Sequence, residues 1–175
     1  VSTRNSQPIT EASLSEKASL IGRTGMMLLS CGTGAWRVRS SMNTLSEALG
    51  ITCSADIGLM SISYTCFDGE SSFSHALSLT TTGVNTSRLN RLEHFVSDFP
   101  AEGIHMSGEA LHSQLDEIER IHGLYSPAAL GLASALACGA FTFLLGGGPL
   151  EMILAFAGAG IGNAIRCKLG KHHFT

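Results

Sequence analysis

The stretch that decides the fold is residues 121–165, IHGLYSPAALGLASALACGAFTFLLGGGPLEMILAFAGAGIGNAI. Its 45 residues contain a single formally charged side chain, Glu151, whereas residues 1–120 contain 13 acidic and 8 basic side chains. A helix of a soluble protein needs polar side chains on its solvent-exposed face, and this stretch has almost none. The sequence therefore predicts a polar amino-terminal part and an apolar carboxy-terminal part rich in glycine and alanine.

Two apolar runs in this stretch predict transmembrane helices. The first run, 128–146, would extend about 28 Å, close to the thickness of about 30 Å of a bilayer core. The second run, 150–165, is shorter, and three readings stay open: a short span, a re-entrant segment, or a span supported by neighbouring helices. A basic cluster, 166–171, follows it and favours a cytoplasmic end. We predict a transmembrane helical hairpin over 126–171, in contact with membrane lipid.

Small residues recur at every fourth position within the two runs, namely Gly131, Ala135 and Gly139 in the first and Gly158 and Gly162 in the second. This spacing lets helix backbones approach closely in lipid, although glycine and alanine are common in membrane helices generally. Two helices cannot enclose a polar path through lipid, because polar groups at that depth need internal partners. We therefore expect a second membrane subunit or a homo-oligomer.

Glu151 is the one ionisable group between the two apolar runs. Ionisable groups at membrane depth are costly, which makes them candidates for function. Glu151 is therefore a candidate for proton coupling. The alternative is an interfacial loop residue that faces water.

Arg37 follows the turn Gly32-Thr33-Gly34 closely. Backbone N–H groups at this turn and the guanidinium together could hold a carboxylate, so these four residues are the candidate substrate-binding set. The alternative is a structural arginine that pairs with an acid such as Glu47.

The polar part begins with residues 1–10, which predict a flexible lead without an apolar signal core. Over 11–124, apolar spacing predicts two helices, two strands joined at Asp68-Gly69, and two further helices, with Thr10 and Ser107 as helix caps. The expected fold class is therefore an α+β cytoplasmic domain of order α-α-β-β-α-α, followed by α-helical transmembrane segments.

Composition excludes several other functions. A net charge of −3 and the lack of a basic stripe argue against nucleic acid as a partner. The five cysteines and seven histidines show no metal-ligand spacing, and the cysteines are typical of reduced thiols in or facing the cytoplasm. No Gly-x-Ser-x-Gly motif is present. We expect no metal, no other cofactor and no enzymatic activity.

An ordered set of landmarks suggests a family. They are Gly32 with Arg37-Val38, then Ala48-Leu49-Gly50, then Gly83, Asn85 and Arg88 in TTGVNTSRLNRL, then Ser107, Glu109 and Ala110, and finally Phe143 to Gly147 with Glu151 after it. From about Leu20 to Phe174 the chain resembles the amino-terminal half of the ThrE threonine/serine exporter family, whose members include split small subunits. Two features depart from that pattern. Arg39 stands where members usually have an acid, and members continue with further membrane helices, so the resemblance implies a truncated product.

The resemblance implies a component of a threonine/serine exporter in the bacterial inner membrane. The chain would be multi-pass, with its amino-terminal domain in the cytoplasm and transport driven by the proton gradient. One alternative is a split-transporter subunit that exports a dicarboxylate such as succinate. The other is a membrane-anchored regulatory module without transport.

Overall fold

The computed structural model describes residues 7–121 and 125–171. The chain divides into two compact units, 1–123 and 124–175, and each is described by itself. In chain order the amino-terminal unit contains the short 3₁₀ helix η1 (Ile9–Glu11), α1 (Leu14–Ser30), α2 (Ala35–Ala48), β1 (Thr52–Ile57), β2 (Ser61–Phe67), β3 (Ser72–Ser78), α3 (Thr86–Asp98), η2 (Gly103–His105) and α4 (Gly108–Glu119). The carboxy-terminal unit contains α5 (Pro127–Leu144) and α6 (Pro149–Lys171).

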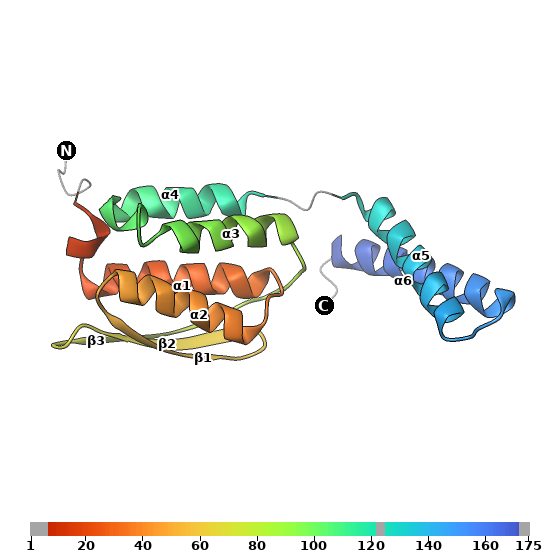
Figure 1. Ribbon diagram of the computed structural model, residues 1–175, viewed down its shortest axis with the longest axis horizontal. Helices are drawn as coiled ribbons and strands as arrows, with labels where there is room; N and C mark the ends of the chain where they lie inside the picture. The colour runs from red at the N-terminus through yellow and green to blue at the C-terminus, as the bar shows by residue number, and fades with distance from the viewer. Residues whose placement is uncertain (1–6, 122–124, 172–175) are drawn as a thin grey trace. The chain divides into compact units, whose positions relative to one another are not determined.

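The amino-terminal unit has three layers (Figure 1). The strands form one antiparallel sheet in the order β1-β2-β3. Helices α1 and α2 cover one face of this sheet, and α3 and α4 lie on the far side of them (Figure 1). Alternate residues of β2, namely Ile62, Tyr64 and Cys66, are buried against the helices, as expected for a strand with one solvated face.

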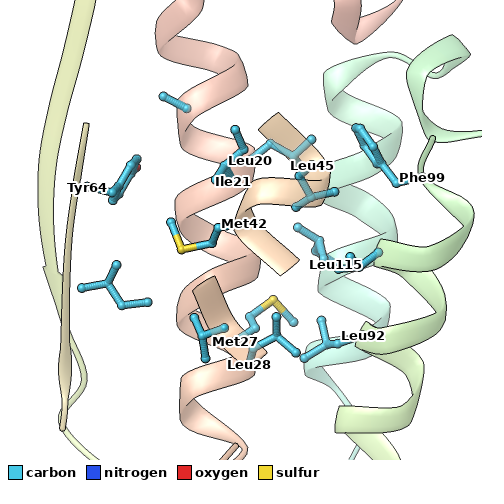
Figure 2. Close-up of a cluster of buried hydrophobic side chains, with 14 of the residues drawn as sticks. Leu20, Ile21, Met27, Leu28, Met42, Leu45, Tyr64, Leu92, Phe99 and Leu115 are labelled. Atoms are coloured by element: carbon cyan, nitrogen blue, oxygen red, sulfur yellow. The ribbon is translucent and has the colours of Figure 1, made fainter. Parts of the chain in front are cut away.

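Helix α1 is the centre of this arrangement. Its buried residues lie on more than one side, because it contacts β2 and β3 as well as α2, α3 and α4. Figure 2 shows Tyr64 on the sheet side of α1, with Leu92, Phe99 and Leu115 on the side of α3 and α4. The hydrophobic core of the unit is therefore built on both sides of one helix.

The predicted fold class is wrong in its strand count. The chain from Thr52 to Ile57 forms β1, which pairs with β2 along its whole length, from Thr52 opposite Phe67 to Ile57 opposite Ile62. The face of β1 that turns towards the helices carries Cys53 and Ala55 and is only half-buried, and alanine and aspartate are weak strand formers. Cross-strand pairing, which the strand's own pattern does not reveal, stabilises β1.

The predicted fold class is also wrong in its membrane segments. The chain runs from helices through a small sheet to further helices, and one helix of the described residues qualifies as a membrane span. Within the described residues, α5 alone is long and apolar enough to cross a membrane. Helix α6 is one continuous helix of 23 residues, but Glu151, Asn163 and Arg166 reduce its apolar character. Only 11% of the apolar window of α5 is buried, so α5 is not the core helix of its unit.

The start of the chain is packed from Pro8 onward. Residues 1–6 of the predicted lead lie outside the described residues, but Ile9 is fully buried and its N–H donates to the Met106 carbonyl at 2.8 Å. Thr10 lies inside η1, so the prediction that it caps the first helix is wrong. Ser13 caps α1 instead, and its Oγ accepts a hydrogen bond from the Glu16 N–H at 3.3 Å.

We expect Gly22→Ala to destabilise the amino-terminal unit. A Cβ at this position would overlap the ring and hydroxyl of Tyr64. Glycine to alanine in a helix ordinarily stabilises by up to about 1 kcal/mol, but overpacking of this kind costs about 1–3 kcal/mol. The free energy of unfolding should therefore fall, measured on the full chain by denaturant titration followed by far-ultraviolet circular dichroism.

Gly25→Ala is the matched control, because its Cβ would approach the side chain of Met42, which can move aside. Combining Gly22→Ala with Tyr64→Leu should recover part of the loss. Equal losses for the two glycines would contradict the steric explanation.

Candidate functional site

Arg37 lies in the first turn of α2 and makes an ion pair with α3. Its Nη1 donates to Oε1 of Glu93 at 2.8 Å, and its guanidinium carbon lies 5.3 Å from the centre of the Trp36 ring. The structure thus places the acidic partner of Arg37 on α3, not at Glu47. Both charged side chains are more than one third exposed, so this pair contributes at most about 1 kcal/mol to stability. Solvent, and a solute in it, can reach the guanidinium.

The turn Gly32-Thr33-Gly34 shapes the start of α2. Gly32 has φ +76°, a left-handed conformation that favours glycine. Gly34 occupies the N-cap position, and no side chain caps this helix start. The structure therefore places the Gly32–Gly34 turn at the amino terminus of α2 and Arg37 in the first turn of that helix, with the Arg37 guanidinium paired to Glu93 of α3.

The landmark around Asn85 joins α3 to the end of α4. The Asn85 Oδ1 caps α3 by accepting from the Arg88 N–H at 3.0 Å, and its Nδ2 donates to the Ile121 carbonyl at 3.0 Å. The Arg88 guanidinium donates to the carbonyls of Glu119 and Ile121. Asn85 and Arg88, both residues of the landmark, therefore provide hydrogen-bond donors for free carbonyl groups at the carboxy-terminal end of α4. This end lies shortly before α5 in the chain.

A second charged cluster connects α1 to α4. The Arg23 guanidinium pairs with Asp116 and with Glu119, and its Nη1 lies 3.3 Å from Nδ1 of His112. The hydrogen bond from Arg23 lowers the pKa of Asp116, while burial and the neighbouring Arg23 charge lower the pKa of His112. The sequence reasoning missed this cluster, because its members lie 89 to 96 positions apart.

Two thiols lie opposite one another in the sheet. Cys53 on β1 pairs in register with Cys66 on β2, and both are free thiols. The neighbouring Cys66 thiol lowers the pKa of Cys53, whereas the neighbouring Cys53 thiol and burial raise the pKa of Cys66, which is fully buried. Over residues 7–121 and 125–171, no three His, Cys, Asp or Glu side chains gather closely enough to hold a metal ion.

A cavity of about 490 Å³ opens between α3 and α4. Its apolar lining includes Phe95, Phe99 and Leu111, and Arg91 and Glu117 are among its charged lining residues. No pattern along the sequence pointed to it, because three separate segments build the walls.

In the carboxy-terminal unit, small residues of α5 face α6. A Cβ at Gly131 would lie 3.3 Å from Nδ2 of Asn163, and one at Gly139 would lie 3.6 Å from the Met152 carbonyl oxygen. Ala135 and Gly139 are the buried residues of α5. A Cβ at Gly158 or Gly162 would meet no neighbour within 4 Å among the described residues.

Glu151 lies in the first turn of α6 and is exposed. An acid at a helix amino terminus is favoured by the helix dipole, which gives this side chain a structural role as well. Arg37 and Glu151 belong to different units, and each is placed only within its own unit.

These features define a class of protein. The chain combines a helical unit around a small sheet with a pair of apolar helices that expose large side chains such as Leu132, Phe143 and Ile153. Extended apolar exposure of this kind is typical of proteins that contact membranes.

The comparison with protein families then identifies the chain. Residues 19–175 match the ThrE family, described as "Putative threonine/serine exporter". The chain belongs to this family, which confirms the resemblance inferred from the landmarks. It is therefore a member of a family of transporters, which is consistent with a membrane protein that is not an enzyme. Searches of curated proteins and of solved structures found no match.

We expect acidification to weaken the amino-terminal unit through His112. The Arg23 Nη1–H donates to Nδ1, so the neutral imidazole fits the folded protein and the pKa of His112 is lowered. The unfolded chain, with a histidine pKa of about 6.5, takes up the proton first as pH falls. This contribution to stability is complete above that value and is lost as pH falls towards the folded pKa.

The measurement is the free energy of unfolding of the full chain at several pH values between neutral and mildly acidic. His112→Asn retains an acceptor and should show a shallower loss than the wild type. His94→Asn, on α3, is the matched control and should retain the wild-type slope. Identical slopes for all three proteins would contradict the role of His112.

Proposed function

We propose that the chain is a component of an exporter that moves threonine or serine out of the cell. The observation that carries this proposal is the family match over residues 19–175. The apolar surface of the carboxy-terminal unit supports it independently, because a transporter must contact lipid.

Helix α5 is the segment that crosses the membrane in this proposal. Its 18 residues extend about 27 Å, and its exposed side chains include Leu132, Phe141 and Phe143. The amino-terminal unit lies in the cytoplasm. The lysine or arginine nearest to α5 in the sequence is Arg120 on its amino-terminal side, which agrees with this orientation. Free thiols at Cys53 and Cys66 also suit a reducing compartment.

The exporter is an assembly. One span cannot enclose a polar path through lipid. The further spans of a multi-pass exporter therefore come from a second membrane subunit or from further copies of this chain. One observation supports this step: Gly158 and Gly162 on α6 lack a close neighbour among the described residues, so this small-residue surface of α6 is open to another helix.

The proposed mechanism is secondary transport, in which proton entry drives amino-acid export. Arg37 would hold the substrate carboxylate at the start of α2, after the substrate displaces Glu93 from the guanidinium. Glu151 would take up and release the coupling proton at the start of α6.

Efflux from preloaded cells tests the proposal. Cells that carry the chain together with a candidate second membrane subunit should lose radiolabelled threonine or serine faster than cells without it. Faster loss of succinate alone would identify a dicarboxylate exporter. Unchanged loss of all three, at confirmed membrane abundance, would leave the regulatory module as the remaining function.

We expect Arg37→Ala to reduce threonine efflux strongly while Glu93→Gln leaves efflux intact or raises it. The reason is that Glu93 competes with the substrate carboxylate for the same guanidinium. Arg39→Ala, on the same helix and exposed, is the matched control and should transport normally. Initial efflux rates at equal membrane abundance are the measurement. Equal losses for Arg37→Ala and Glu93→Gln would show that only the ion pair between the helices matters.

We expect Glu151→Gln to abolish the dependence of efflux on the proton gradient. The amide keeps the size of the side chain but cannot carry a proton. Efflux should be measured with and without an imposed pH gradient, and Glu70→Gln, exposed beyond β2, is the control. A normal gradient response of Glu151→Gln would remove this residue from the coupling step.

A further inference from the structure

Three loops meet at one end of the amino-terminal unit, and none of them carries a charge. They are 31–36, which joins α1 to α2 and includes the first two residues of α2, 58–60 between β1 and β2, and 79–85 between β3 and α3. Backbone hydrogen bonds join them: the Gly83 N–H donates to the Ser30 carbonyl at 3.1 Å, and the Leu79 N–H donates to the Met60 carbonyl at 2.8 Å. We call these three loops together the uncharged end.

The uncharged end exposes large apolar side chains at its tips. Trp36 is 71% exposed, Leu59 is 91% exposed and Val84 is 84% exposed. Arg37, next to Trp36 in the chain, is paired with Glu93 of α3. A single exposed apolar residue is ordinary on a protein surface, but one on each of three adjoining uncharged loops indicates a surface that contacts something apolar.

The opposite end of the unit has the reverse character. The turn between β2 and β3 carries Asp68 and Glu70, and the connection from α3 to α4 carries Glu102 and His105. Phe67, beside that turn, is the large apolar side chain exposed there, and it is only 47% exposed. The contrast between the two ends shows that the absence of charge is a property of one surface and not of the whole unit.

The chain leaves the unit from the uncharged end. The side chains of Asn85 and Arg88, at the start of α3, bind the carbonyl of Ile121 at 3.0 and 3.2 Å, so the chain just after α4 is held beside the loop that bears Val84. Six peptide units separate Ile121 from Pro127, the first residue of α5, and they reach at most about 21 Å. The length of the connection therefore tethers the uncharged end to the candidate membrane span.

We propose that the uncharged end contacts the lipid interface of the membrane, with Trp36, Leu59 and Val84 inserted at the level of the headgroups and upper acyl chains. Tryptophan is enriched at this depth because its ring is apolar and its N–H is polar. This inference rests on the proposal that α5 crosses the membrane.

The single tryptophan makes the test direct. The full chain is reconstituted into phosphatidylcholine–phosphatidylglycerol vesicles, with or without lipids brominated near the top of the acyl chains, and Trp36 emission is recorded. Brominated lipid should remove most of this emission, and aqueous iodide should remove little. Emission that iodide quenches but brominated lipid does not would overturn the inference, and so would emission that neither quenches, because it would place Trp36 against protein.

Matched variants place the same probe elsewhere. In a Trp36→Phe background, Leu59→Trp should be quenched by brominated lipid, whereas Phe67→Trp should be quenched by iodide instead. Equal lipid quenching at positions 59 and 67 would overturn the inference. Flotation of the vesicles separates it from the proposed function: a chain that floats but keeps Trp36 in water refutes the contact alone, and a chain that does not float refutes both.

Discussion

The amino-terminal unit depends on the burial of α1 on two sides. One side packs on the sheet and the other on α3 and α4, so every layer of the unit meets at this helix. Gly22 lets β2 approach α1 closely and Gly25 does the same for α2, because Tyr64 and Met42 respectively occupy the space that a Cβ would need. Thr24, which is fully buried, donates its hydroxyl to the Leu20 carbonyl and so leaves no unpaired donor at this position in the core. A helix with a single apolar face could not hold three layers together.

This central position also explains where the charged residues of the helices lie. Arg23 reaches past the apolar surface of α1 to Asp116 and Glu119 on α4. Arg37 does the same from α2 to Glu93 on α3. Both pairs are partly exposed and contribute little to stability individually, but each links the middle layer to the outer helices in one orientation. The Arg37 pair therefore has an architectural role that coexists with its proposed part in binding.

Local patterns predicted the parts of the fold that are locally encoded. Apolar spacing located the helices, and Ser107 caps α4 as expected, accepting from the Ala110 N–H. Long-range contacts were beyond that reasoning. The strand β1 forms only because β2 lies beside it, and the partner of Arg37 lies 56 positions away on α3. The sequence also showed that the second apolar run is short. It did not show that α6 continues as one helix through its polar residues.

The absence of charge carries information at two scales. Along the chain it singles out 121–165, because 45 consecutive residues hold one formal charge. The same absence at the uncharged end escapes any window along the sequence, since its loops are separated by strands and helices that carry ordinary charges. Folding brings the three loops together, and only then do Trp36, Leu59 and Val84 form one apolar surface. Desolvating a charge costs far more than desolvating a hydroxyl, so threonine-rich loops such as 79–85 would reach the upper acyl chains at a lower cost than charged loops. Asn85, in the last of these loops, binds the carbonyl of Ile121, where the uncharged stretch 121–165 begins. In the proposal made above, contact with lipid is the one physical requirement that accounts for both uncharged regions.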